Sequence, residues 1–352
     1  MADRKAASQK KITSTLKTHQ GSLLLPDSSI GVLLAQLGTP DAPEPAAVRR
    51  FLAEFLADER VVDLPRWFWL PLLHGVILPR RSPRSAALYR KIWRADGVSP
   101  LLHDSRTVTA GVAERLGASI RVELGMRYGQ PGLTALLHTM VRTGIQRLLI
   151  VPLFPQFSSA TTASITDAVC GAFASSRFQP ALRFVPPFFN DPGYIHALAT
   201  TLRQQLDPAQ PVDWLFSFHG LPQRFVDQGD PYALQCAETA RLLAKELHLP
   251  NERWHIGYQS RFGREVWLLP DTARLLATLP GQGKRAVAVV CPGFVADCLE
   301  TLEEMAVQGK ETFLRAGGET FHYLACLNDA PPWIDALTTL IRRELSGWME
   351  EM

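Results

Sequence analysis

Short apolar runs alternate with longer amphipathic segments along most of the chain. Residues 31–38 are apolar except for Gln36 and end in a Gly-Thr-Pro turn, whereas residues 44–57 carry their large apolar side chains on one helical face. Buried strands of parallel sheets have such continuous runs because helices cover both faces, so the alternation predicts an α/β fold. Further strands are predicted at residues 119–124, 147–152, 182–185, 212–218, 255–259 and 286–291, and helices at residues 131–143, 192–206 and 231–247.

The pattern also repeats within the chain. Residues 147–157 read as a strand, a Pro-x-Phe turn and the start of a helix, and residues 285–294 follow the same order. We therefore predict two similar α/β domains, with ligands bound at the carboxyl ends of the strands. The predicted units are a polar tail at residues 1–29, a first domain at residues 30–152 plus 323–352, and a second domain at residues 153–322.

One segment departs from the alternation. Residues 67–78 are almost wholly apolar and include Pro71, but they are too few to span a bilayer, which takes about 20 residues. Two interpretations stay open: a buried core helix, or an apolar lip over a pocket for a large flat ligand. The second interpretation allows peripheral membrane contact through residues 67–78.

Composition narrows the classes of function. The 352 residues carry a net charge of +3 with dispersed basic residues, so nucleic acid is not a predicted partner. The five cysteines form no CxxC pair and are odd in number, which argues against a disulfide framework and favours a reducing compartment. Residues 1–29 lack the apolar stretch of a secretory signal, so we expect a cytoplasmic protein; a mitochondrial transit peptide is the other interpretation of this segment.

Two segments of the sequence carry side chains suited to catalysis or metal binding at positions where α/β proteins bind ligands. His219 directly follows the apolar strand at residues 212–218, and a histidine at a carboxyl strand end can act as a base or a metal ligand. Asp297, Glu300 and Glu304 recur at helical spacing near the start of a predicted helix. Each place also has a structural explanation: a histidine bonded to a nearby carbonyl, and a solvated helix start with Asp297 as the N-cap.

Motifs around these residues make the chain resemble the ferrochelatase family. The clearest are Ser-Phe-His-Gly-Leu-Pro at residues 217–222 and the carboxylate-rich segment at residues 293–304. The others, in family order, are Gln-Leu-Gly-Thr-Pro at 36–40, Pro-Arg-Arg-Ser-Pro at 79–83, Gly-Val-Ser-Pro at 97–100, Met-Arg-Tyr at 126–128, Pro-Gln-Phe-Ser at 155–158 and Gln-Ser-Arg-Phe-Gly at 259–263. The resemblance implies a chelatase-like fold of two Rossmann-like domains with a porphyrin bound between them.

The resemblance also implies roles for single residues. His219 and Glu300 would be the catalytic and metal-binding pair, with an accessory path for metal or protons through Asp297 and Glu304. A porphyrin loses its pyrrole N–H protons as the metal enters; a histidine can accept them, and imidazole with carboxylate can hold Fe²⁺ loosely enough to release it. Five further positions would hold the macrocycle, its rim or its propionates: Leu37, Arg81, Tyr89, Ser99 and Trp267.

The implied activity is insertion of Fe²⁺ into protoporphyrin IX, the last step of heme biosynthesis. Porphyrin and iron would be substrates, with no permanently bound cofactor. We expect no iron–sulfur cluster, because the last cysteine is Cys326 and Ser159 stands where animal relatives have a cluster cysteine. Cys298 replaces a histidine found in many relatives, which leaves the route of iron entry open. The alternatives are a chelatase for coproporphyrin or for cobalt or nickel insertion, and a non-catalytic heme carrier.

Overall fold

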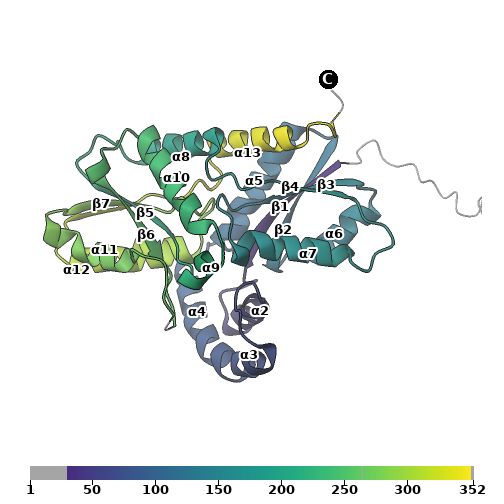
Figure 1. Ribbon diagram of the computed structural model, residues 1–352, viewed down its shortest axis with the longest axis horizontal. Coiled ribbons are helices and arrows are strands. Elements are labelled where there is room, and N and C mark those ends of the chain that lie inside the picture. Colours follow the sequence, from purple (N-terminus) through teal and green to yellow (C-terminus); the bar gives the residue numbers. More distant parts are fainter. Residues whose placement is uncertain (1–29, 264, 350–352) are drawn as a thin grey trace, which may run out of the picture.

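In the computed structural model, which describes residues 30–263 and 265–349, the chain forms two parallel four-stranded sheets (Figure 1). The first sheet has the strand order β2-β1-β3-β4 and the second has the order β6-β5-β7-β8, so the two halves share one topology. This finding confirms the predicted fold of two similar α/β halves. The strands are β1 (Ile30–Thr39), β2 (Ile120–Gly129), β3 (Arg147–Pro152), β4 (Ala181–Phe184), β5 (Asp213–His219), β6 (Trp254–Gln259), β7 (Ala286–Val290) and β8 (Thr320–Tyr323).

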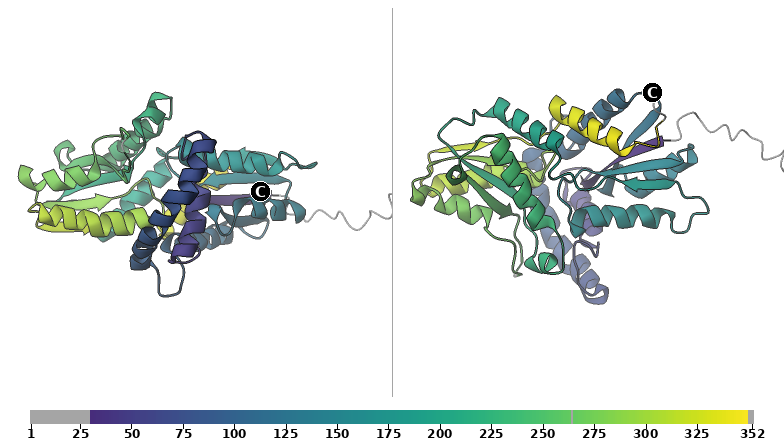
Figure 2. Two further views of the ribbon diagram at one scale, coloured as in Figure 1. Left: turned by 90° about the horizontal axis from the view of Figure 1, so that it is seen from below. Right: turned by 45° about the horizontal axis from the view of Figure 1, so that its top comes forward.

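Helices cover both faces of each sheet (Figures 1 and 2). Helices α5, α8, α10 and α13 share one large core with both sheets, in which Trp214 and Trp333 are fully buried. The opposite faces are covered by α6 and α7 on the first sheet and by α11 and α12 on the second. The bounds are α5 (Pro100–Leu116), α6 (Leu133–Arg142), α7 (Ser164–Phe173), α8 (Pro192–Gln205), α10 (Tyr232–Glu246), α11 (Thr272–Thr278), α12 (Lys310–Arg315) and α13 (Pro331–Glu344).

The sheet order differs from the predicted division of the chain at residue 153. Strand β4 pairs in parallel with β3, so the first sheet continues to Phe184, well beyond that boundary. Helix α13 packs against α5 and α8, which brings the C-terminal segment back to the first half. The predicted polar tail at residues 1–29 lies outside the described residues.

Short helices complete the connections: η2 (Ser159–Ala163), α9 (Gln223–Asp227), η3 (Asn251–Arg253) and η4 (Pro280–Gln282).

A helical projection follows β1 and stands between the two sheets (Figure 2). It consists of α2 (Pro45–Leu56), α3 (Arg66–Leu72), the π-helical turn η1 (Leu73–Ile77) and α4 (Leu78–Ile92). The apolar residues 67–78 divide between its two sides: Trp69, Leu73 and Leu78 are buried in its core, whereas Trp67 is 81% exposed and Phe68 is 50% exposed. The segment therefore combines buried core residues with exposed aromatic ones, so it is in part the core helix of the first interpretation.

Asp58, just after α2, fastens this projection to the first sheet. Its carboxylate accepts hydrogen bonds from Tyr128 Oη at 2.8 Å and Ser164 Oγ at 2.6 Å, and it pairs with Arg127. Burial raises the pKa of Asp58, but the hydrogen bonds and the Arg127 charge outweigh burial and lower it below its ordinary value. The charged Asp58 carboxylate thus holds the projection against the first sheet.

Candidate functional site

His219 is the last residue of β5, opposite Gln259 at the end of β6. Its Nδ1 lies 2.6 Å from the carbonyl oxygen of Gly220. Because a carbonyl oxygen only accepts hydrogen bonds, Nδ1 carries the proton in this arrangement. Nε2 is then left with a free lone pair, as a general base or a metal ligand requires.

The turn after His219 is fixed against β6. Gly220 donates its backbone N–H to the Gln259 carbonyl at 2.7 Å, and a Cβ at this position would lie 2.5 Å from the same oxygen. Glycine is required here because the two backbones approach so closely. Trp267 packs beside Gly220 and contacts Phe262 with ring centroids 4.9 Å apart, so this predicted site residue supports the His219 turn.

The backbone of Glu300 and the carboxylate of Glu304, both on the π-helix η5 (Glu300–Gly309), lie beside this strand end. Gln259 Nε2 donates to the Glu300 carbonyl at 2.7 Å, and Ser260 donates from its backbone N–H and its hydroxyl to the Glu304 carboxylate at 2.6 and 2.5 Å. Burial raises the pKa of Glu304, while the Ser260 hydrogen bonds oppose this rise. The Ser260 hydrogen bonds thus hold the Glu304 carboxylate at the end of β6, the strand that pairs with β5 and His219.

Helix α4 contributes two predicted porphyrin-binding residues to the same region. Burial lowers the pKa of Arg81 and raises that of Tyr89, and the charge of Glu300 acts on both groups. The Arg81 guanidinium lies 5.2 Å from the centroid of the Phe262 ring. Arg81 and Tyr89 are thus carried by a helix, α4, that packs against η5.

Leu37, Ser99 and Asp297 have structural partners in the described residues. Leu37 packs against the core of the projection. Ser99 is 2% exposed and caps α5 by accepting a hydrogen bond from the Leu102 N–H at 3.3 Å. Asp297 is buried and accepts hydrogen bonds from a set of neighbours that includes Thr301 Oγ1 at 2.8 Å and Asn328 Nδ2 at 2.7 Å.

The helix predicted from Asp297 has a different start and a different register. The Asp297 carboxylate turns inward and does not cap the first turn; η5 begins at Glu300, and Leu299 is its flanking residue. Thr301 Oγ1 instead accepts the Cys298 N–H at 2.9 Å. The predicted N-cap is wrong because Thr301, Tyr323 and Asn328 compete successfully for the same carboxylate.

Asp104 on α5 is a second acidic group near Asp297. Burial raises its pKa to about 6, with the charge of Asp297 adding to this rise. Because the folded pKa lies above the ordinary aspartate value of 3.8, folding favours the protonated form, and stability is lost as pH rises through about 6.

Asp104→Asn is therefore expected to raise the melting temperature at pH 8 and to have a smaller effect at pH 5. Thermal denaturation at both pH values measures the difference. Asp335→Asn, which removes an exposed carboxylate paired with Arg115, is the control and should not stabilise the protein at pH 8. An equal effect of Asp104→Asn at both pH values would contradict the assignment.

Sequence reasoning gave no role to Gln259 or Ser260. Both lie in a quoted motif, but only the pairing of β6 with β5 brings them to His219 and η5. Ser260 has a φ of 63°, which is uncommon for a residue other than glycine, and this conformation turns its N–H toward Glu304. A serine after an apolar strand carries no signal for such a conformation.

The described residues hold no cluster of three or more His, Cys, Asp or Glu side chains in a metal-binding arrangement. Burial raises the pKa of the Cys298 thiol, and the neighbouring Glu300 charge raises it further. Because thiolates and not thiols bind metals well, the protonated Cys298 is a weak ligand.

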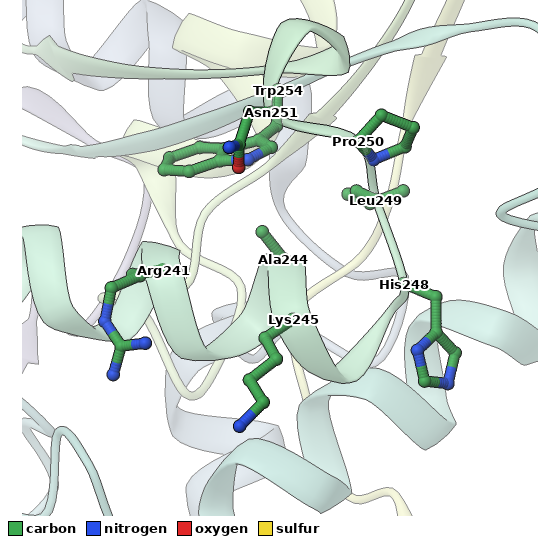
Figure 3. Close-up of a pocket in the computed structure, with 8 residues that line it drawn as sticks. All are labelled: Arg241, Ala244, Lys245, His248, Leu249, Pro250, Asn251 and Trp254. Carbon is green, nitrogen blue, oxygen red and sulfur yellow. The ribbon is translucent and has the colours of Figure 1, made fainter.

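A groove of about 470 Å³ lies elsewhere, between the end of α10 and the start of β6 (Figure 3). Lys245, His248 and Trp254 are among its lining residues. Trp254 begins β6 whereas Gln259 ends it, so the groove lies at the opposite strand end from His219. The groove is therefore separate from the region around His219.

The two matching parallel sheets are those of the chelatase fold. SirB from Bacillus subtilis, solved with Fe³⁺, aligns with a TM-score of 0.57 and 11% identity over 90% of this chain and 96% of that one. The sirohydrochlorin chelatase SirB from Bacillus subtilis subspecies spizizenii, solved with cobalt, aligns with a TM-score of 0.52 and 12% identity over 70% of this chain and 90% of that one. At these identities the likeness concerns the fold alone.

The chain belongs to the ferrochelatase family, whose model matches residues 29–345. A ferrochelatase of Nitrosococcus oceani is 49% identical over 91% of this chain and 88% of that protein, and one of Yersinia enterocolitica is 47% identical over 91% and 99%. The sequence-based resemblance is confirmed. The protein is a lyase of heme biosynthesis, with porphyrin and ferrous iron as its substrates.

Proposed function

We propose that this protein inserts Fe²⁺ into protoporphyrin IX, forming protoheme and releasing two protons, with His219 and Glu300 as its catalytic and metal-binding pair. The observation that carries the residue assignment is the meeting of three elements: the end of β5, the start of η5 and the porphyrin-side helix α4. His219 ends β5 with Nδ1 on the Gly220 carbonyl, Gln259 beside it donates to the Glu300 carbonyl, and α4 packs against η5.

In this proposal the porphyrin lies against α4, with its nitrogens toward His219. Nε2 accepts a pyrrole proton, because Nδ1 already donates to the Gly220 carbonyl. The Glu300 carboxylate presents the iron, for which oxygen and imidazole ligands are suitable and exchangeable. Arg81 is suited to a propionate because its planar guanidinium can bind a carboxylate through two hydrogen bonds.

The other predicted residues take supporting roles. Glu304 lies near His219 and belongs to the accessory path for metal or protons, and Asp297 joins that path at the start of η5. Five residues are assigned to the macrocycle, its rim or its propionates: Leu37, Arg81, Tyr89, Ser99 and Trp267. For Ser99, the buried cap on α5 supports an indirect role, as the residue that fixes the start of that helix.

We also propose that the protein acts in the cytoplasm, has no iron–sulfur cluster and touches membranes peripherally through residues 67–78. All five cysteines are free, which suits a reducing compartment. The exposed Trp67 and Phe68 are suited to a membrane interface. No helix in the described part of the chain has both the length and the apolar character needed to cross a bilayer.

The test is an anaerobic insertion assay of the purified protein with Fe²⁺ or Zn²⁺, comparing protoporphyrin IX with coproporphyrin by absorbance. We expect metalloprotoporphyrin to form faster than in the protein-free reaction, and protoporphyrin to be preferred. A preference for coproporphyrin would support the alternative chelatase. Binding of porphyrin, seen as fluorescence quenching without insertion, would support the heme carrier.

A further inference from the structure

Lys91 and Glu303 join α4 to η5. Lys91 Nζ lies 2.8 Å from Glu303 Oε1, and the Glu303 side chain is only 2% exposed. Gln308 donates from Nε2 to the second oxygen, Oε2, of the same carboxylate. A buried carboxylate is costly unless it is paired and hydrogen-bonded, and here each oxygen has its own partner.

The two elements that this pair joins carry the two sides of the proposed site. Arg81 and Tyr89 are on α4, and Tyr89 is two residues from Lys91. Glu300 and Glu304 are on η5, and Glu303 lies between them. A shift of one element relative to the other would change the distance between the porphyrin-side groups and the metal-side carboxylates.

The Gln308 contact depends on the helical register. In a π-helix the backbone hydrogen bonds run from i to i+5, so residues five apart lie on adjacent turns. In an α-helix the side-chain neighbours are instead three and four residues apart. The bond from Gln308 to Glu303 spans five residues and therefore matches the π-helical register.

We propose that Glu303 is a positioning residue, which through Lys91 and Gln308 holds η5 in its π-helical register and at a fixed distance from α4. This inference rests on the proposed function. Glu303 touches neither iron nor porphyrin; it acts by keeping Glu300 and Glu304 aligned with a porphyrin held by Arg81 and Tyr89. Removing either partner of the carboxylate frees η5 to move.

The kinetic test compares Lys91→Met, Lys91→Arg and Gln308→Ala in Zn²⁺ insertion into protoporphyrin. We expect Lys91→Met and Gln308→Ala to lower kcat/KM for the metal about tenfold, as is typical when a residue supporting metal ligands is lost. Porphyrin affinity should be unchanged by fluorescence titration, and Lys91→Arg should retain activity because it keeps the cation. Arg315→Met, which breaks an exposed pair with Glu311 on the adjoining α12, is the matched control.

Hydrogen exchange of residues 300–309, measured by mass spectrometry, tests the same proposal with a readout that does not depend on metal insertion. Lys91→Met and Gln308→Ala should speed exchange there and leave β5 unchanged. Unchanged exchange in η5 would overturn the positioning role, as would a lower melting temperature with normal metal kinetics. If the wild-type protein inserts no metal, the proposed function fails, while the exchange measurement still decides whether this network holds η5.

Discussion

His219→Ala is expected to lower kcat for metal insertion by about 10²–10⁴-fold, the usual contribution of a positioned general base. The variant removes the Nε2 lone pair that the Gly220 carbonyl leaves free by engaging Nδ1. Anaerobic insertion of Zn²⁺ or Fe²⁺ into protoporphyrin measures the loss. Porphyrin binding should change little, because the proposed porphyrin contacts come from other residues, among them Arg81 and Tyr89 on α4.

Adding imidazole to the assay tests whether the group missing from His219→Ala is a base. It should restore part of the activity of His219→Ala if the missing group is a base, and should leave the wild-type rate unchanged. His196→Ala, which removes an exposed histidine paired with Glu246, is the control and should insert metal at the wild-type rate. A loss of less than about tenfold, roughly 1.4 kcal/mol of barrier, would contradict the role of His219.

The strands that carry the site were predictable because they are buried on both faces. Residues 147–152 coincide with β3, and the predicted run at 212–218 overlaps β5 except for one residue at each end. Parallel strands of this kind read as continuous apolar runs. His219 follows from the same pattern, since a polar residue at the end of such a run marks the carboxyl edge of the sheet.

The division into halves was harder to predict than the strands. β4 is short and only partly buried, and its sequence does not say which sheet it joins. Its pairing with β3 extends the first sheet beyond residue 153. Strand partners depend on tertiary packing, so a repeat in the sequence indicated two sheets without giving the crossover between them.

The surroundings of Glu300 were the least predictable part. Carboxylates at helical spacing suggested an ordinary α-helix, but η5 is a π-helix that also has contacts from outside the segment. Gln259 reaches the Glu300 carbonyl from β6, and Lys91 reaches Glu303 from α4. Such partners are distant along the chain, so local pattern cannot indicate them.

Glu300→Gln is expected to lower kcat/KM for the metal by at least about tenfold, roughly 1.4 kcal/mol. The amide keeps the shape of the side chain but removes the negative charge that Arg81 and Tyr89 experience. Carboxylate oxygens hold a divalent cation far better than an amide does, so the loss should fall on the metal. Steady-state insertion at varied Zn²⁺ and fixed protoporphyrin measures it.

Two further variants test the charge at position 300 and which of the two carboxylates serves the metal. Glu300→Asp keeps the carboxylate and should retain more activity than Glu300→Gln. Glu304→Gln should cause a smaller loss than Glu300→Gln, because Ser260 already engages the Glu304 carboxylate with two hydrogen bonds and leaves it less available to iron. If Glu304→Gln proves the more damaging change, the metal-side role belongs to Glu304, and Glu300 serves mainly to balance the charge of Arg81.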